Sequence, residues 1–233
     1  MITVRRSQER GHAQLGWLDS WHTFSFSNYY DPKHMGFHSL RVINDDIIAP
    51  GRGFGMHPHE DMEIITYLLD GELAHKDSLG TGAVLRPGDV QRMSAGTGMV
   101  HSEYNASTTA PARLLQIWIE PDRMGVTPRY EDRHFPSASR TDQSRLIASP
   151  DGRDGSLAIH QDALVSASVL SPGFTLTARI TPGHGGYLQL ARGQLHVPGA
   201  TLSAGDAISC EELTELAVTA GAGGAEFLLF DVA

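Results

Sequence analysis

The sequence predicts an all-β protein, and three observations support this fold class. Twenty-five glycines and 12 prolines recur at short intervals along the 233 residues. Short runs rich in Val, Ile, Leu, Tyr and Thr lie between them, a pattern typical of strands joined by tight turns. No long stretch shows a convincing apolar period of about 3.6 residues, which an amphipathic helix would require.

The individual elements follow from turn chemistry. Tyr67–His75 reads as a strand, a tight turn at Asp70-Gly71 and a second strand. Arg86-Pro-Gly-Asp89 predicts another turn. Leu114–Ile119 predicts a further strand, and its imperfect alternation indicates that this strand is well buried.

A weak internal repeat favours two domains, and the chain length allows them because one domain holds roughly 100 to 200 residues. Tyr67-Leu-Leu-Asp-Gly-Glu-Leu73 resembles Tyr187-Leu-Gln-Leu-Ala-Arg-Gly-Gln-Leu195. Pro87-Gly-Asp89 resembles Ala204-Gly-Asp206 in the same order along the chain. The two halves therefore look like relatives.

The composition between the halves sets the expected boundaries. Residues 136–156 are rich in Ser, Asp, Arg and Gly, which is typical of a linker. We therefore expect an N-terminal domain at residues 1–135 and a C-terminal domain at residues 157–233.

Composition also limits the classes of partner and compartment. The formal net charge of -9 argues against direct, nonspecific attachment to nucleic acid, which depends on clustered Lys and Arg. No run of about 18 apolar residues is present, so we expect no membrane span. The basic N-terminus has no apolar segment after it, and the one cysteine, Cys210, fits a reducing compartment. We expect a cytoplasmic protein.

Two short motifs carry the chemistry: His57-Pro-His59 and His101-Ser-Glu103. Each places two metal-capable side chains at positions i and i+2, and such residues share one face of a strand. Two neighbouring strands can therefore aim three imidazoles and one carboxylate at one point. The glycine-rich approaches Gly51–Gly55 and Ser94–Gly98 let backbone pass close to such a crowded centre.

These donors suit a divalent metal. Imidazole and carboxylate bind iron, manganese, nickel, copper, cobalt or zinc, whereas a thiolate zinc site is excluded because Cys210 is the only cysteine. Four ligands around an octahedral metal leave two open positions, which favours chemistry over a purely structural role.

The repeat indicates that only one half can bind metal in this way. When the two halves are aligned on their turns, His57 and His59 correspond to Arg179 and Thr181. His101 corresponds to Val218, and Glu103 corresponds to Ala220 in the same alignment. The second half therefore keeps the scaffold without the ligands.

The first half resembles the cupin superfamily and, within it, the pirin family, particularly its bacterial quercetinase-like members. The residues that carry the resemblance are Gly51-(five residues)-His57-Pro-His59-(three residues)-Glu63, Pro87-Gly-Asp89, Met93-Ser-Ala-Gly-Thr-Gly98, His101-Ser-Glu103, Trp21-His-Thr-Phe-Ser-Phe26 and Arg41-Val-Ile-Asn-Asp45. In the second half the likeness is general.

The resemblance implies a bicupin, in which two β-barrels pack together and the N-terminal barrel holds the metal, commonly Fe2+. It also implies that the fourth ligand is Glu103, and geometry agrees because Glu103 shares a face with His101. Glu63 occupies the general cupin glutamate position and is then expected to be a structural acid near the site.

The resemblance further implies a quercetin 2,3-dioxygenase-like oxidoreductase that opens the flavonol ring with dioxygen and releases carbon monoxide. Glu103 would accept the proton of the flavonol hydroxyl, and the substrate would be a planar aromatic molecule. Eukaryotic pirins suggest an alternative, a non-catalytic iron-binding regulator whose redox state controls its binding to a protein partner. A third possibility is another enolisable substrate.

The remaining histidines have no partner of this kind, and we expect them to be surface or structural residues: His12, His22, His34, His38, His75, His134, His160, His184 and His196. Among them, His34 and His38 are candidates for the mouth of a pocket. The early aromatic residues are expected to pack in a core, although an aromatic wall would also suit a planar ligand: Trp17, Trp21, Phe24, Phe26, Tyr29 and Tyr30.

Overall fold

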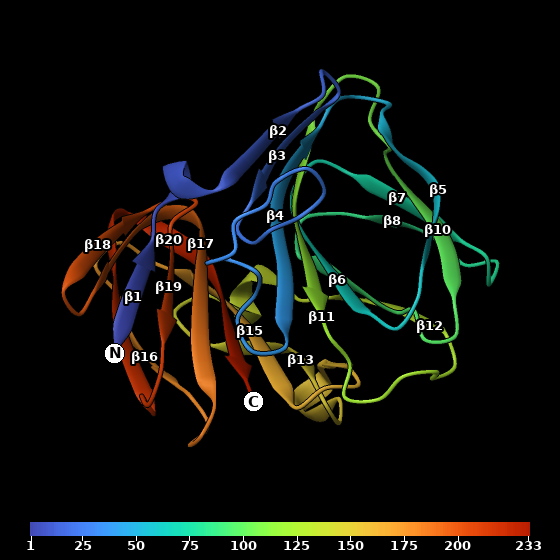
Figure 1. Cartoon of the computed structure of the whole chain (residues 1–233). Helices are drawn as coiled ribbons and strands as arrows, with labels where there is room; N and C mark the ends of the chain where they lie inside the picture. Colours follow the sequence, from blue (N-terminus) through green and yellow to red (C-terminus); the bar gives the residue numbers. More distant parts are fainter. The chain divides into compact units, whose positions relative to one another are not determined.

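The computed structural model describes all residues 1–233 and contains 20 strands and three short 3-10 turns, which confirms the predicted all-β class. The chain forms two compact units (Figure 1). The N-terminal unit comprises Gly11–His134 and Ile159–Gln161, and the C-terminal unit comprises Met1–Arg10, Phe135–Ala158 and Asp162–Ala233. None of the helical turns has the length and hydropathy needed to traverse a membrane.

The N-terminal unit contains two antiparallel sheets. The larger has the strand order β12-β9-β6-β11-β4-β3-β2, and the smaller has the order β5-β10-β7-β8. The larger sheet is built from β2 (Gly11–Gln14), β3 (Leu18–His22), β4 (Leu40–Ile48), β6 (Glu63–Asp70), β9 (Asp89–Ser94), β11 (Ala112–Ile119) and β12 (Arg129–His134). The smaller sheet is built from β5 (Gly53–His59), β7 (Leu73–Asp77), β8 (Gly82–Leu85) and β10 (Met99–Asn105).

The expected elements are present in this unit. Gly71 joins β6 to β7 with a φ of 78°, and Gly88 lies between β8 and β9 with a φ of 97°. Both values fall in the left-handed region that glycine adopts without a steric cost. The strand expected at Leu114–Ile119 lies in β11, which is paired on both sides by β4 and β6.

Strand periodicity sorts the interior of the N-terminal unit into an apolar band and a polar band. Leu114 of β11 lies opposite Leu68 of β6, and both belong to a buried apolar cluster. Two residues further along, Gln116 lies opposite Thr66 on the same face. The polar band is where the candidate ligands lie.

The C-terminal unit is a nine-stranded sheet whose path runs β1-β19-β17-β20-β15-β13-β14, while β16 pairs with β20 and β18 pairs with β17. Its strands are β1 (Ile2–Arg5), β13 (Arg145–Ser149), β14 (Leu157–Ala158), β15 (Ala163–Leu170), β16 (Thr175–Arg179), β17 (Gly185–Val197), β18 (Ala200–Ser203), β19 (Ala207–Cys210) and β20 (Glu215–Val232). The 3-10 turns are η1 (Ser7–Glu9), η2 (Ser137–Ser139) and η3 (Arg153–Gly155).

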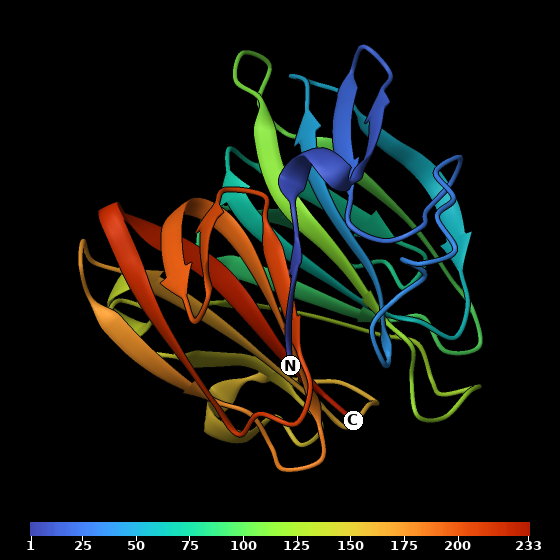
Figure 2. The same ribbon diagram turned by 60° about the vertical axis from the view of Figure 1, so that its left-hand side comes forward.

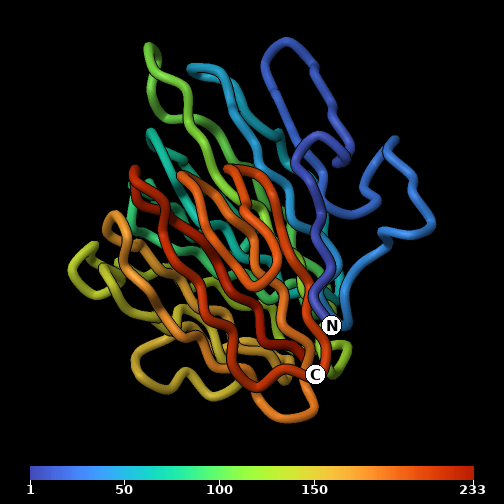
Figure 3. Tube along the Cα trace, turned by 90° about the vertical axis from the view of Figure 1, so that its left-hand side faces the viewer, coloured from blue at the N-terminus to red at the C-terminus, as the bar shows by residue number.

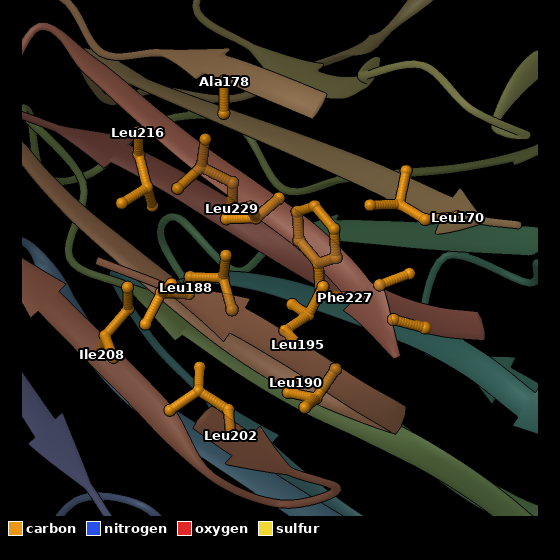
Figure 4. Packing of buried hydrophobic residues seen from close by; sticks show 14 of the residues in the cluster. Leu170, Ala178, Leu188, Leu190, Leu195, Leu202, Ile208, Leu216, Phe227 and Leu229 are labelled. Carbon is orange, nitrogen blue, oxygen red and sulfur yellow. The ribbon is translucent and has the colours of Figure 1, made fainter. Parts of the chain in front are cut away.

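Apolar side chains fill the interior of the C-terminal unit. Leu188, Leu190, Phe227 and Leu229 are among the residues that pack together there (Figure 4). Val218, at the position that corresponds to His101, is fully buried in the same cluster. This barrel therefore holds hydrocarbon where the N-terminal barrel holds polar groups.

The unit boundaries differ from the expected ones at the N-terminus. Met1–Arg10 belong to the C-terminal unit because β1 pairs with β19, as the blue strand beside the red and orange strands shows (Figure 2). Arg6 also forms an ion pair of 2.8 Å with Asp206. Both ends of the chain therefore belong to the C-terminal unit (Figure 3).

The segment 136–156 is not a free linker. It contains β13, which pairs with β15 and buries Ile147 completely. The Ser, Asp and Gly residues around this short strand do form turns, as their composition indicates. The apolar run within β13 is long enough for one strand, but it is too short to be recognised among the polar residues on either side.

Candidate metal centre

The two sequence motifs lie on adjacent antiparallel strands. His57 and His59 are on β5, and His101 is on β10 directly opposite His57. Because residues i and i+2 share a face, this register brings all three imidazoles to one side of the smaller sheet. Candidate ligand nitrogens of the three lie within 4.8 Å of one another.

Gly53 explains why the approach to this cluster is rich in glycine. A Cβ atom at this position would lie 2.1 Å from the carbonyl oxygen of Glu103 and 2.5 Å from the Cα of Tyr104. Any side chain at residue 53 would therefore push β10 away from β5. At Gly55, by contrast, a Cβ would meet only the hydroxyl of Tyr104, at an ordinary distance of 3.7 Å.

The environment keeps the imidazoles of His59 and His101 neutral. Burial, assisted by the neighbouring His57 and His59, lowers the pKa of His101 to about 2. Burial and His57 together lower the pKa of His59 to about 4. Neutral rings keep the lone pairs that a metal requires.

Hydrogen bonding at the cluster leaves ring nitrogens available to a metal. His57 Nδ1 lies 2.7 Å from the carbonyl oxygen of Gly55, which can only accept, so Nδ1 donates and Nε2 is the ring nitrogen left for a metal. His101 is completely buried, and neither of its ring nitrogens has a hydrogen-bond partner. Orphaned nitrogens in a dry site are costly unless something binds them. The donor set therefore fits a divalent cation.

Glu103 is buried on β10, and the register of β10 with β5 shifts between His101 and Glu103. Its Oε1 accepts from Thr66 Oγ1 at 3.2 Å and from Gln91 Nε2 at 3.1 Å, and its Oε2 accepts from Gln116 Nε2 at 3.3 Å. Burial raises the pKa of Glu103, although these hydrogen bonds and nearby histidines oppose the shift. The carboxylate is thus both held in place and made more basic than usual.

Glu103 belongs to a second group of candidate ligands, together with His75 and His101. His101 is therefore a member of both this group and the cluster formed with His57 and His59. His75 was expected to be a surface or structural residue, yet it is buried opposite Glu103 in the pairing of β7 with β10. Its Nε2 lies 3.1 Å from Asp77, and its ring stacks on Tyr130 with centroids 4.4 Å apart. The one sequence feature that could have pointed to His75 is its i, i+2 spacing from Asp77, which resembles the spacing in the two ligand motifs.

Glu63 lies in neither group of candidate ligands. It begins β6 and is almost fully buried. Ser94 Oγ donates to it at 2.9 Å, and His160 Nδ1 lies 2.9 Å from its other oxygen. These contacts hold it in place within the N-terminal unit.

A cavity of about 250 Å³ lies beside the cluster, and His57, His59 and Glu103 contribute to its lining. One wall is aromatic and consists of Phe26, Phe54 and Trp118. Trp118 packs edge-on against the ring of His59, with centroids 5.0 Å apart, and against Phe26 at 5.4 Å. A flat aromatic molecule would find apolar faces next to the ligand candidates.

The cavity includes some of the aromatic and histidine residues considered above. Phe26 and His22 line it, so Phe26 belongs to the aromatic wall that would suit a planar ligand, and His22 is a buried residue of the lining. Neither His34 nor His38 is among the lining residues, and His34 instead lies 2.8 Å from Asp31. The loop that carries them is therefore not part of this wall.

Comparisons with known proteins agree with the fold and the motifs. Residues 3–119 match the family described as Pirin, and residues 146–232 match the family described as Quercetinase C-terminal cupin domain. The chain is 47% identical over 232 residues to the quercetin 2,3-dioxygenase of Escherichia coli K12, which covers 100% of this chain and 99% of that protein. It is 42% identical over 234 residues to a pirin-like protein of Caulobacter vibrioides, with full coverage of both.

Solved structures show the same architecture. YhhW from Escherichia coli superposes with a TM-score of 0.95 at 46% identity, over 100% of this chain and 98% of that one. A second structure, bacterial pirin YhhW in complex with nickel(II), gives a TM-score of 0.94 at 46% identity, with coverages of 100% and 99%. The expected bicupin fold and the likeness to quercetin 2,3-dioxygenase-like oxidoreductases are thereby confirmed.

Proposed function

Because the chain belongs to the pirin family, we propose that it is a metal-dependent dioxygenase that cleaves flavonols such as quercetin. The observation that supports this most strongly is the juxtaposition of three imidazoles, a basic buried carboxylate and an aromatic-walled cavity. Relatives that are alike over their whole length carry the name quercetin 2,3-dioxygenase, which supports the choice of substrate.

His57, His59, His101 and Glu103 are the proposed metal ligands. The orphaned ring nitrogens of His101 and the lowered pKa of His59 support this assignment. We propose Fe2+ as the resident ion, and the same nitrogen and oxygen donors also accept Mn, Ni, Co, Cu or Zn. A divalent metal held there would supply a Lewis acid for the 3-hydroxyl and neighbouring carbonyl of a flavonol.

Glu103 is the proposed general base. Its raised pKa makes it a better proton acceptor than an ordinary carboxylate, while Thr66, Gln91 and Gln116 keep it oriented. It takes the proton of the 3-hydroxyl and leaves an electron-rich enolate. Dioxygen oxidises this enolate, both oxygen atoms enter the ring-opened ester, and one ring carbon leaves as carbon monoxide.

The aromatic wall has two tasks in this reaction. Phe54 and Trp118 offer apolar surface for the flat rings of the substrate and limit the access of water to the base. The cavity also favours a small-molecule substrate over the alternative of an iron-binding regulator with a protein partner, because such a regulator has no need for an aromatic-walled space beside its metal.

An aerobic assay tests the proposed function. Protein loaded with Fe2+ should bleach the visible absorbance of quercetin only when dioxygen is present. The His101→Ala variant, loaded in the same way, should not. Equal rates for the two proteins would mean that the cluster does not carry the activity.

A further inference from the structure

A row of polar side chains crosses one face of the seven-stranded sheet, one from each of five adjacent strands. His22 lies opposite Asn44, and Asn44 lies opposite Gln116. Gln116 lies opposite Thr66, and Thr66 lies opposite Gln91. Residues directly opposite each other in an antiparallel pair point to the same face, so the five form one continuous row.

The two ends of this row have different surroundings. Gln116, Thr66 and Gln91 donate hydrogen bonds to Glu103. His22 and Asn44 lie on the two strands beyond Gln116 and line the cavity instead. The row therefore runs from the proposed base into the space where a substrate would bind.

A second pair enlarges the cavity end of the row. Ser20 of β3 lies opposite Asp46 of β4, two residues from His22 and Asn44 respectively. The i, i+2 spacing places all four side chains on the same face. All four line the cavity, and none is more than 4% exposed. A block of four buried polar residues thus lines the cavity beside its apolar residues.

Asn44 has an unsatisfied acceptor in this block. The residue is 3% exposed, and its Oδ1 has no hydrogen-bond partner. Buried amide oxygens are almost always paired, because leaving one unpaired forfeits the hydrogen bonds it made in water. An acceptor of this kind, on the wall of a cavity, is complementary to a hydroxyl hydrogen of a ligand.

Asp46 is the second group that a ligand hydroxyl can meet. Its neighbour Asp45 points to the other face, where Arg113 binds both of its oxygens at 2.9 Å. Asp46 instead accepts a hydrogen bond from Ser20 in the cavity wall. Burial raises its pKa to about 7, with Asp45 and Glu103 adding to the shift, so near neutral pH it can accept or donate. The Asp45-Asp46 dipeptide thus has one structural member and one that faces the cavity.

We propose that Asn44 and Asp46 form a subsite that recognises a hydroxyl group of the substrate other than the one that binds the metal. The inference rests on the proposed function for the metal-binding end of the ligand. It narrows the substrate class to planar enols with at least one additional hydroxyl. The hydrogen of that hydroxyl is accepted by Asn44 Oδ1, and Asp46 binds the same group or its neighbour.

Equilibrium binding of two flavonols tests the subsite. Quercetin and 3-hydroxyflavone share the chelating hydroxyl and ketone, but 3-hydroxyflavone lacks every other hydroxyl. Each is titrated without dioxygen into nickel-loaded protein, and quenching of tryptophan fluorescence reports binding. The wild-type protein should bind quercetin about tenfold or more tightly than 3-hydroxyflavone. This ratio of the two affinities corresponds to about one good hydrogen bond. Asn44→Leu, which keeps the branched shape and the number of side-chain heavy atoms, should bring the ratio of the two affinities close to one, and Asp46→Asn should lower it.

The control variant is Leu15→Ala, on the apolar lining of the same cavity. It should weaken both flavonols to a similar extent and leave their ratio unchanged. An unchanged ratio in Asn44→Leu would overturn the subsite while quercetin turnover by wild-type protein still supports the dioxygenase. Selective binding without turnover in air would support the subsite and overturn the dioxygenase. Failure of wild-type protein to bind either flavonol would overturn both.

Discussion

His101 lies directly opposite His57 in the pairing of β10 with β5, and the centroids of their rings are 4.5 Å apart. This single register position fixes the cluster, because His59 follows on the same face of β5. A slip of one residue would turn His101 to the opposite face. The cluster therefore depends on the packing of the two backbones as much as on the ligands.

Removing one imidazole should remove the metal. His101→Ala leaves two histidines, and we expect metal content after loading and desalting to fall to less than about a tenth of the wild-type value, since each ligand contributes strongly to affinity. Elemental analysis measures this directly. His196→Ala, which changes an exposed histidine of the C-terminal unit, is the matched control and should keep full metal content. Full occupancy in His101→Ala would refute the ligand assignment.

Glu103→Gln should separate metal binding from proton transfer. The amide keeps the shape of the side chain, so most of the metal should remain bound, while quercetin turnover should fall by about 100-fold or more, as for the loss of a general base. Steady-state rates normalised to metal content provide the comparison. Turnover equal to that of the wild type would show that another group accepts the proton.

Gly53→Ala should weaken the metal site, although residue 53 is not itself a ligand. Its new methyl group would meet the carbonyl oxygen of Glu103 at 2.1 Å, so β5 and β10 must separate. We expect a lower melting temperature and a metal content below half of the wild-type value, read by calorimetry and elemental analysis. Gly55→Ala, with its nearest contact at 3.7 Å, should behave like the wild type. Similar behaviour of the two variants would contradict the role assigned to Gly53.

Asp46 should make the stability of the metal-free protein depend on pH. Its pKa is about 7 in the folded protein, compared with an ordinary value of about 4 in an unfolded chain. Between these values the folded state holds a proton that the unfolded state has lost, so the free energy of unfolding falls as pH rises. Urea unfolding at about pH 5 and about pH 7.5 measures this slope. Asp46→Asn should flatten it, and an unchanged slope would mean that Asp46 does not titrate in this window.

The sequence predicts most of the ligand constellation because strand periodicity is local. The i, i+2 spacing of His57 with His59, and of His101 with Glu103, already implies a shared face within each strand. Which strands are neighbours was an inference from the motifs, and the pairing of β5 with β10 agrees with it. The left-handed turn at Gly71 was also readable, because its sequence favours a turn.

The sequence could not reveal features that depend on cross-strand register. The row from His22 to Gln91 joins residues of five strands, and no single strand shows an unusual pattern. His75 becomes part of the site only because β7 pairs with β10. Similarly, Met1–Arg10 join the C-terminal unit through a pairing with β19, about two hundred residues away in the chain.

The most direct test of the proposed dioxygenase is the yield of carbon monoxide per quercetin consumed. Protein loaded with Fe2+ is incubated with quercetin in air, and the gas is captured with reduced myoglobin while quercetin loss is followed by its absorbance. We expect equal amounts of carbon monoxide formed and quercetin lost with the wild-type protein, and neither with His101→Ala. Loss of quercetin without carbon monoxide, or no loss with any of the first-row metals named above, would contradict the proposed dioxygenase.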